Sequence, residues 1–99
     1  MHVIEIIQSD TFIKWLSVLK DANAKTRIVA RMVKMSEGSL GDVKPVGEGV
    51  SEARIHYGPG YRLYFLRRGE LLIIMLAGGD KRTQPSDIKR AKQLAEQWR

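Results

Sequence analysis

The sequence predicts an α+β fold in which one antiparallel sheet packs against helices. Apolar residues recur at helical spacing in the first part of the chain and alternate, as in strands, after residue 51. The chain has 99 residues, of which 43% are hydrophobic and 28% are charged, which is typical of a folded protein. A chain of this length has room for one core, so we expect a single domain over residues 1–99.

The N-terminal half predicts a strand followed by two helices. A short β-branched run at 3–7 indicates the strand, and Ser9-Asp10-Thr11 can cap a helix over 10–20. Asp21 can cap a second helix over 22–36. The expected buried stripes are Phe12, Trp15, Leu16 and Leu19 on the first helix and Ile28, Met32 and Met35 on the second.

The C-terminal half predicts a meander of three strands and a last helix. Residues 37–51 are rich in Gly and Ser and contain Pro45, so we expect a long loop there. Gly-rich turns separate three strand-like segments, and Thr83 to Ser86 can open a helix with Pro85 in its first turn. The strands are expected at 52–57, 61–68 and 71–78, and the helix would bury Ile88, Ala91, Leu94, Ala95 and Trp98. The predicted order is βααβββα.

Composition excludes several classes of protein. The most apolar run, Leu71 to Ala77, is far shorter than the roughly 20 residues of a transmembrane helix, and the N-terminus does not resemble a signal sequence. We therefore expect a cytoplasmic protein that does not engage a membrane. The chain has no cysteine and two histidines far apart, so we expect no disulfide, no metal and no cofactor.

Positive charge is concentrated in the second half of the chain. The net charge is +6, and residues 50–99 carry ten Lys and Arg against five Asp and Glu. An excess of this kind favours an anionic partner, of which nucleic acid is the commonest. Earlier in the chain, Arg27, Arg31 and Lys34 form a basic stripe on the second helix. That stripe is interpreted either as a solvated face or as a contact for RNA or for an inhibitory protein.

A basic cluster is expected on one face of the meander. If Tyr57 pairs with Tyr61, then Ile55 faces Leu63 and Ala53 faces Phe65 on the core side. The same register places His56 opposite Arg62 and Arg54 opposite Tyr64, on the face expected to lack helix packing. Because opposed cations repel each other, such a cluster is most easily explained by a bound anion such as phosphate.

This cluster has the residue types that metal-free RNA cleavage needs. In that reaction the ribose 2′-hydroxyl attacks the neighbouring phosphate, so a base, cations and an acid are required. Arg62 and Arg54 are candidates to stabilise the phosphorane, and His56 is a candidate base or acid. Tyr64 and Tyr61 are candidates to contact RNA, although both suit a core equally well.

A second group of cations follows the last predicted strand. Lys81 and Arg82 come directly after Gly78-Gly79-Asp80 and just before the last helix. The free N–H groups and the dipole of a helix N-terminus favour anions. We therefore predict that Lys81 and Arg82 lie at the edge of the cluster and take part in catalysis.

Two segments in the second half of the chain resemble a known family. Residues 52–65, EARIHYGPGYRLYF, and residues 71–91, LLIIMLAGGDKRTQPSDIKRA, are similar to the RelE/ParE toxins, and specifically to the HigB-like or phage-derived Gp49-like addiction-module killer proteins. The most specific parts are GPGYR at 58–62 and GGDK with Thr83-Gln84. The resemblance implies a sheet with two N-terminal helices on one side. It also implies a toxin that cleaves mRNA at the ribosome and is silenced by a cognate antitoxin, often a helix-turn-helix protein.

The resemblance also assigns roles by position. Arg62 matches the family arginine that follows Gly-Tyr, Arg54 and His56 hold basic positions of the preceding strand, and Lys81-Arg82 match the basic pair after the last strand. One departure is evident: well-known RelE nucleases use a tyrosine near the start of the last helix, where this chain reads Pro85-Ser86-Asp87-Ile88.

Three functions follow from these observations, and one is preferred. The first is a ribosome-dependent endoribonuclease, in which Arg54, His56 and Arg62 act together on the RNA. The alternatives are a ParE-like inhibitor of DNA gyrase, in which this cluster has no catalytic duty, and a non-enzymatic RNA-binding module. Three convergent groups that suit phosphate favour the nuclease.

Overall fold

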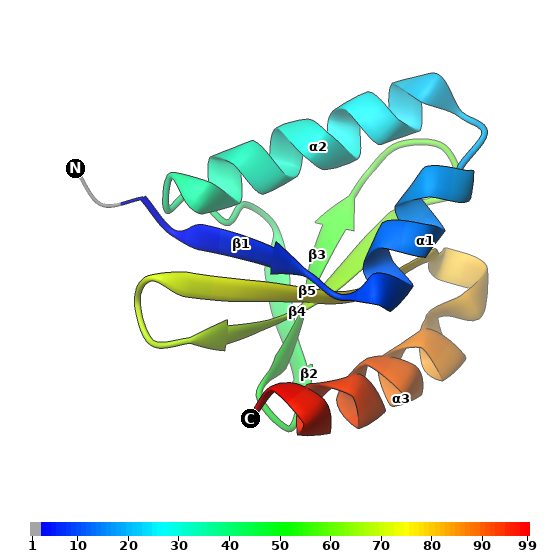
Figure 1. The fold of residues 1–99 in the computed structure, drawn as a ribbon. Coiled ribbons are helices and arrows are strands. Elements are labelled where there is room, and N and C mark those ends of the chain that lie inside the picture. The colour runs from blue at the N-terminus through cyan, green and yellow to red at the C-terminus, as the bar shows by residue number, and fades with distance from the viewer. Residues whose placement is uncertain (1–2) are drawn as a thin grey trace.

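The computed structural model describes residues 3–99 and shows a five-stranded sheet with helices on both faces (Figure 1). Helices α1 and α2 cover one face, and α3 covers the other. Short 3-10 turns, Lys81–Thr83 and Glu96–Trp98, flank α3. The elements are β1 (Glu5–Gln8), α1 (Asp10–Val18), α2 (Ala22–Ser36), β2 (Val43–Gly47), β3 (Val50–Ile55), β4 (Tyr61–Arg68), β5 (Leu72–Asp80) and α3 (Gln84–Ala95).

Most of the predicted elements are confirmed. The second helix and the strand at 61–68 have the predicted bounds, and the predicted caps are formed: Ser9 accepts from the N–H of Phe12, and Asp21 accepts from Asn23 and Ala24. The first helix ends at Val18, because Leu19 has an extended backbone.

The sheet has the strand order β1-β5-β4-β3-β2. Strands β3, β4 and β5 form the antiparallel meander that the sequence predicts. The N-terminal strand β1 pairs with β5 in parallel, with Ile6 beside Ile73 and Ile7 beside Ile74. Strand β1 therefore forms one edge of the sheet, and β2 forms the other.

The prediction of a long loop over residues 37–51 was wrong for much of this segment. Residues 43–47 form β2, which pairs with β3, and β3 itself begins at Val50. Pro45 concealed this strand, because proline lacks the N–H that an interior strand needs and is tolerated on an edge strand. Glu48 and Gly49, with φ values of 55° and 79°, make the tight turn between β2 and β3.

Two hydrophobic clusters hold the layers together. The first joins α1 and α2 to the sheet through the predicted stripes, including Phe12, Ile28 and Met35, all fully buried. The second joins α3 to the opposite face through Ala91, Ala95 and their neighbours. The expectation that this second face lacks helix packing was therefore wrong, because α3 folds back across it. Its predicted stripe supplies the contact.

Two adjacent glycines allow helices to approach both faces of β5. A Cβ added at Gly78 would lie 2.3 Å from the ring of Trp15, and one added at Gly79 would lie 1.8 Å from Oδ2 of Asp87. Both distances are impossible for real atoms. The Gly78-Gly79 pair thus has a packing role, since it lets α1 and α3 approach the strand closely.

No helix among residues 3–99 has both the length and the hydrophobicity that crossing a membrane demands.

Ser9 ties the start of α1 to the middle of the sheet. Its side chain is buried, accepts a hydrogen bond from the N–H of Phe12 at 3.0 Å and donates one to the carbonyl of Leu76 at 2.7 Å. We predict that Ser9→Ala lowers the free energy of unfolding by about 1–3 kcal/mol, because it removes the cap and leaves a buried carbonyl without this donor. Urea denaturation measures the change.

The matched control is Ser17→Ala, which removes an exposed hydroxyl bonded only to the carbonyl of Lys14 in its own helix. It should change stability by less than about 0.5 kcal/mol. Equal effects of the two substitutions would contradict the role of Ser9.

Candidate functional site

A buried carboxylate organises the polar side chains between the sheet and α3. Glu52 on β3 has no exposed surface. Its Oε1 accepts from Nε of Arg54 at 2.9 Å, and its Oε2 accepts from the hydroxyl of Tyr64 at 3.1 Å and from Nε2 of Gln84 at 2.7 Å. Burial alone raises the pKa of Glu52, but these three hydrogen bonds outweigh it and the pKa is lowered. Glu52 is therefore an ionised centre that fixes its neighbours.

Arg62 is a buried cation whose donors are not all used. Its residue surface is 7% exposed, and its Nε lies 3.9 Å from Oε2 of Glu52, which is an ion pair without a hydrogen bond. Among residues 3–99 this Nε has no hydrogen-bond partner. A buried unpaired donor is costly in a native structure and is retained only for a reason such as strain, catalysis or a bound water or ion.

An open pocket of about 610 Å³ lies over these side chains. Arg54 and Arg62 contribute from β3 and β4, Lys81 from the turn after β5, and Gln84 from the start of α3. His56 and the turn 57–60 complete it. Gly60, with φ +81°, makes this turn and lies close to both Lys81 and Arg62. The structure thus brings four of the five predicted catalytic residues to one pocket.

The predicted register between the first and second meander strands, β3 and β4, was wrong by two residues. Ile55 pairs with Tyr61, Arg54 with Arg62 and Ala53 with Leu63. Because strand faces alternate with a period of two, this shift leaves each side chain on its predicted face. The two arginines are nevertheless directly opposed, and Glu52, opposite Tyr64, compensates their charge. A carboxylate of the protein itself thus balances the charge for which a bound anion was predicted.

The two tyrosines predicted to contact RNA are buried. Tyr61 is 7% exposed and lies on the other face of the sheet, against the edge of Trp15 at 6.3 Å between ring centroids. Tyr64 is fully buried beneath α3, and burial raises the pKa of its hydroxyl, which donates to Glu52. Neither ring is open to a nucleobase in this structure.

The three basic residues of the α2 stripe lie in three different environments. Arg31 donates to three carbonyls, those of Leu40, Asp42 and Arg54, so its guanidinium is committed within the fold. Arg27 lies over the ring of Tyr57, 4.4 Å from its centroid. Lys34 is exposed. The stripe is thus neither a uniform solvated face nor a continuous binding surface.

The basic pair after β5 is split between two positions. Lys81 lines the pocket, whereas the side chain of Arg82 is 83% exposed and pairs with Asp80 at 3.2 Å. Arg82 does not line the pocket. Its predicted catalytic role remains a prediction.

Three residues of the site were missed in the sequence. Glu52 stands two positions before Arg54 on the same strand, so strand alternation alone would have placed it on the basic face. Gln84 is brought in by the return of α3, which the sequence pattern does not reveal. Asp42, whose Oδ2 lies 2.6 Å from Nε2 of His56, comes from the loop before the concealed strand β2.

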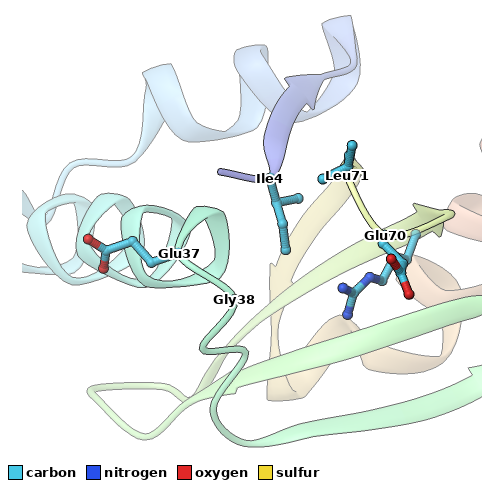
Figure 2. A pocket seen from close by; sticks show the side chains of 6 residues that line it. Ile4, Glu37, Gly38, Glu70 and Leu71 are labelled. Atoms are coloured by element: carbon cyan, nitrogen blue, oxygen red, sulfur yellow. The ribbon is translucent and has the colours of Figure 1, made fainter. Parts of the chain in front are cut away.

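A second pocket, of about 290 Å³, lies between the end of α2 and the β4–β5 turn (Figure 2). Ile4 and Leu71 contribute apolar surface, and Figure 2 shows that the carboxylates of Glu37 and Glu70 lie on opposite sides and do not converge. Among the described residues, no group of three His, Cys, Asp or Glu side chains is placed to hold a metal ion. The basic pocket is therefore the better candidate site.

Comparison with known proteins finds a sequence relative and a structural neighbour. No protein-family model matches the chain. An uncharacterized protein of Haemophilus influenzae is 47% identical over 94 residues, which is 95% of each chain. A structure of the Escherichia coli toxin RelE, a double arginine-to-alanine mutant in the free state, superposes with a TM-score of 0.73 at 14% identity. The match covers 94% of this chain and 97% of the RelE chain, so the two share a fold.

We predict that Glu52→Gln lowers the free energy of unfolding at neutral pH by about 3 kcal/mol or more, because it leaves buried Arg62 without a counter-charge. Chemical denaturation measures the change. Glu70→Gln, at an exposed position in the β4–β5 turn, is the control and should be nearly neutral. If Glu52→Gln leaves the free energy of unfolding unchanged, the carboxylate does not organise the site.

The lowered pKa of Glu52 also predicts an acid sensitivity. A carboxyl whose pKa is lower in the folded state stabilises the protein above its unfolded pKa of about 4.3, and this contribution is lost as pH falls through the folded pKa. The stability difference between wild type and Glu52→Gln should therefore shrink as pH falls below about 4. Unfolding curves across this range test it, and a difference independent of pH would contradict it.

Proposed function

We propose that this chain, which belongs to the same family as the uncharacterized Haemophilus influenzae protein, is the toxin of a type II toxin–antitoxin system. We propose further that it is a metal-independent endoribonuclease that cleaves mRNA on the ribosome in the cytoplasm. The shared fold with RelE supports the first statement. The residues of the basic pocket support the second.

One observation carries the proposal: buried Arg62, with its free Nε, lines a pocket together with Arg54, Lys81 and His56. Guanidinium groups stay charged and present paired donors that match phosphate oxygens. Because Glu52 holds Arg54 by a hydrogen bond, that donor is positioned before substrate arrives. Donors fixed in advance are the main source of transition-state stabilisation in reactions that develop negative charge.

The pocket holds groups for each step of cleavage. His56 takes the proton from the ribose 2′-hydroxyl, whose oxygen bonds to phosphorus while the bond to the 5′-oxygen breaks. Arg62 and Arg54 stabilise the charge on the phosphorane. Lys81 gives a proton to the leaving 5′-oxygen, since guanidinium groups do not release theirs. The products are a 2′,3′-cyclic phosphate and a free 5′-hydroxyl.

The antitoxin would be an acidic segment that covers this pocket. The net charge of +6 and the open basic pocket favour such a partner over an uncharged one. We propose that this segment belongs to a helix-turn-helix protein encoded beside the toxin. Co-purification with the product of the neighbouring gene tests the pairing.

We predict that Arg62→Ala and Arg62→Lys lower the rate of mRNA cleavage by roughly a hundred- to a thousand-fold, the usual effect of removing one positioned transition-state donor. The assay is single-turnover cleavage of mRNA on programmed ribosomes, with circular dichroism to show that each variant is folded. Arg68→Ala is the matched control, because Arg68 is exposed on the same strand, about 20 Å away. It should cleave at the wild-type rate.

A folded Arg62→Lys protein that cleaves at the wild-type rate would exclude this pocket as the active site. A wild-type protein that leaves mRNA intact but blocks DNA supercoiling would identify a gyrase inhibitor instead. In that case Arg54, His56 and Arg62 would be expendable for toxicity.

A further inference from the structure

The loop before β2 places a carboxylate against the imidazole of the pocket. Oδ2 of Asp42 lies 2.6 Å from Nε2 of His56, and the hydrogen bond to His56 is the main reason that the pKa of Asp42 is lowered. An ionised carboxylate accepts hydrogen bonds and cannot donate them. Nε2 of His56 must therefore carry a proton, and Nδ1 is the nitrogen that remains for a substrate.

Arg31 holds this loop in place from α2. Its Nε donates to the carbonyl of Leu40 at 2.8 Å, its Nη2 to that of Asp42 at 2.9 Å, and its Nη1 to that of Arg54 at 2.9 Å. The N–H of Arg54 also donates to the carbonyl of Asp42 at 2.9 Å. Arg31 thus binds the loop and the neighbouring strand together, two residues before His56.

Gly41 makes this arrangement possible. Its φ is +76°, and a Cβ at this position would lie 2.9 Å from Cζ of Arg31. A side chain here would push the guanidinium away from the carbonyls it binds. The loop sequence is therefore fitted to the arginine that anchors it.

We infer that Asp42, anchored by Arg31, is a positioning residue that fixes His56 in the Nε2–H form and so leaves Nδ1 as the general base of the pocket. This inference rests on the proposed function. In the step concerned, Nδ1 accepts the proton of the ribose 2′-hydroxyl, and the resulting imidazolium is stabilised by the Asp42 carboxylate. A carboxylate that orients a histidine in this way acts on the reaction without touching the substrate.

The electrostatics of the pocket argue against an incidental surface pair. A carboxylate at the rim of a cationic pocket repels the RNA phosphates that the pocket attracts. The side chain of Asp42 is 53% exposed and that of His56 is 70% exposed, so the contact gains little stability for the fold. A role in orienting His56 explains why Arg31 anchors the backbone of this loop through the carbonyls of Leu40 and Asp42.

The experiment compares Asp42→Asn, His56→Gln and the double variant in single-turnover cleavage on programmed ribosomes. Asp42→Asn should lower the maximal rate by about 100-fold and leave the half-saturating concentration unchanged or lower, because repulsion of RNA is removed. The double variant should lose no more rate than His56→Gln, because Asp42 acts through His56 alone. Glu70→Gln is the control for loss of one negative charge and should match the wild type.

A readout without RNA separates this inference from the proposed function. Long-range nitrogen–proton NMR correlations report which imidazole nitrogen carries the proton. The neutral wild-type His56 should be the Nε2–H form, and Asp42→Asn should give a mixture of both forms. Unchanged tautomers would overturn the inference even if the protein cleaves RNA, as would full activity of Asp42→Asn or additive losses in the double variant. A wild-type protein that shows no cleavage overturns the proposed function, and with it the role of Nδ1 as a base.

Discussion

The buried carboxylate of Glu52 is the interaction on which the site depends. A charge with no exposed surface is tolerated only when it is paired and hydrogen-bonded, and Glu52 has an arginine, a tyrosine and a glutamine as donors. These donors come from β3, β4 and the start of α3, so one side chain joins three elements. It also permits Arg54 and Arg62 to face each other, since two opposed guanidinium groups without an anion would repel. Within residues 3–99, the buried Nε of Arg62 is left without a hydrogen bond by this arrangement.

The sequence predicted the elements well where one periodicity dominates. The stripes of α2 and α3, the caps at Ser9 and Asp21 and the strand β4 all follow from local patterns, which tertiary contacts reinforced. The prediction failed for β2, because Pro45 and the flanking glycines are typical of loops and an edge strand tolerates them. The sequence also did not predict which face of the sheet α3 covers, because periodicity identifies the apolar face of a helix but not the sheet face against which it packs.

The sequence predicted which residues belong to the site better than it predicted how they are arranged. Strand alternation grouped Arg54, His56 and Arg62, and the position of Lys81 after the last strand placed it at the edge of the cluster. Alternation is insensitive to a register shift of two residues, so the opposing pairs were misassigned. Tyr61 and Tyr64 lie on opposite faces of the sheet, and both are buried because helices cover both faces. Asp42 and Gln84 reach the pocket through long-range folding of a loop and a helix. No local pattern encodes such contacts.

The parallel pairing of β1 with β5 has a consequence for synthesis of the chain. The first strand leaves the ribosome early, yet its partner is encoded near the end, and the bond from Ser9 to Leu76 spans 67 residues. Domains complete such distant pairings only after the intervening chain has been made. Gln84, which completes the shell of Glu52, is made later still. Nascent chains that stop before β5 therefore lack the pairing of β1, and those that stop before α3 lack an assembled pocket, so the complete pocket forms only after the chain has been translated through α3.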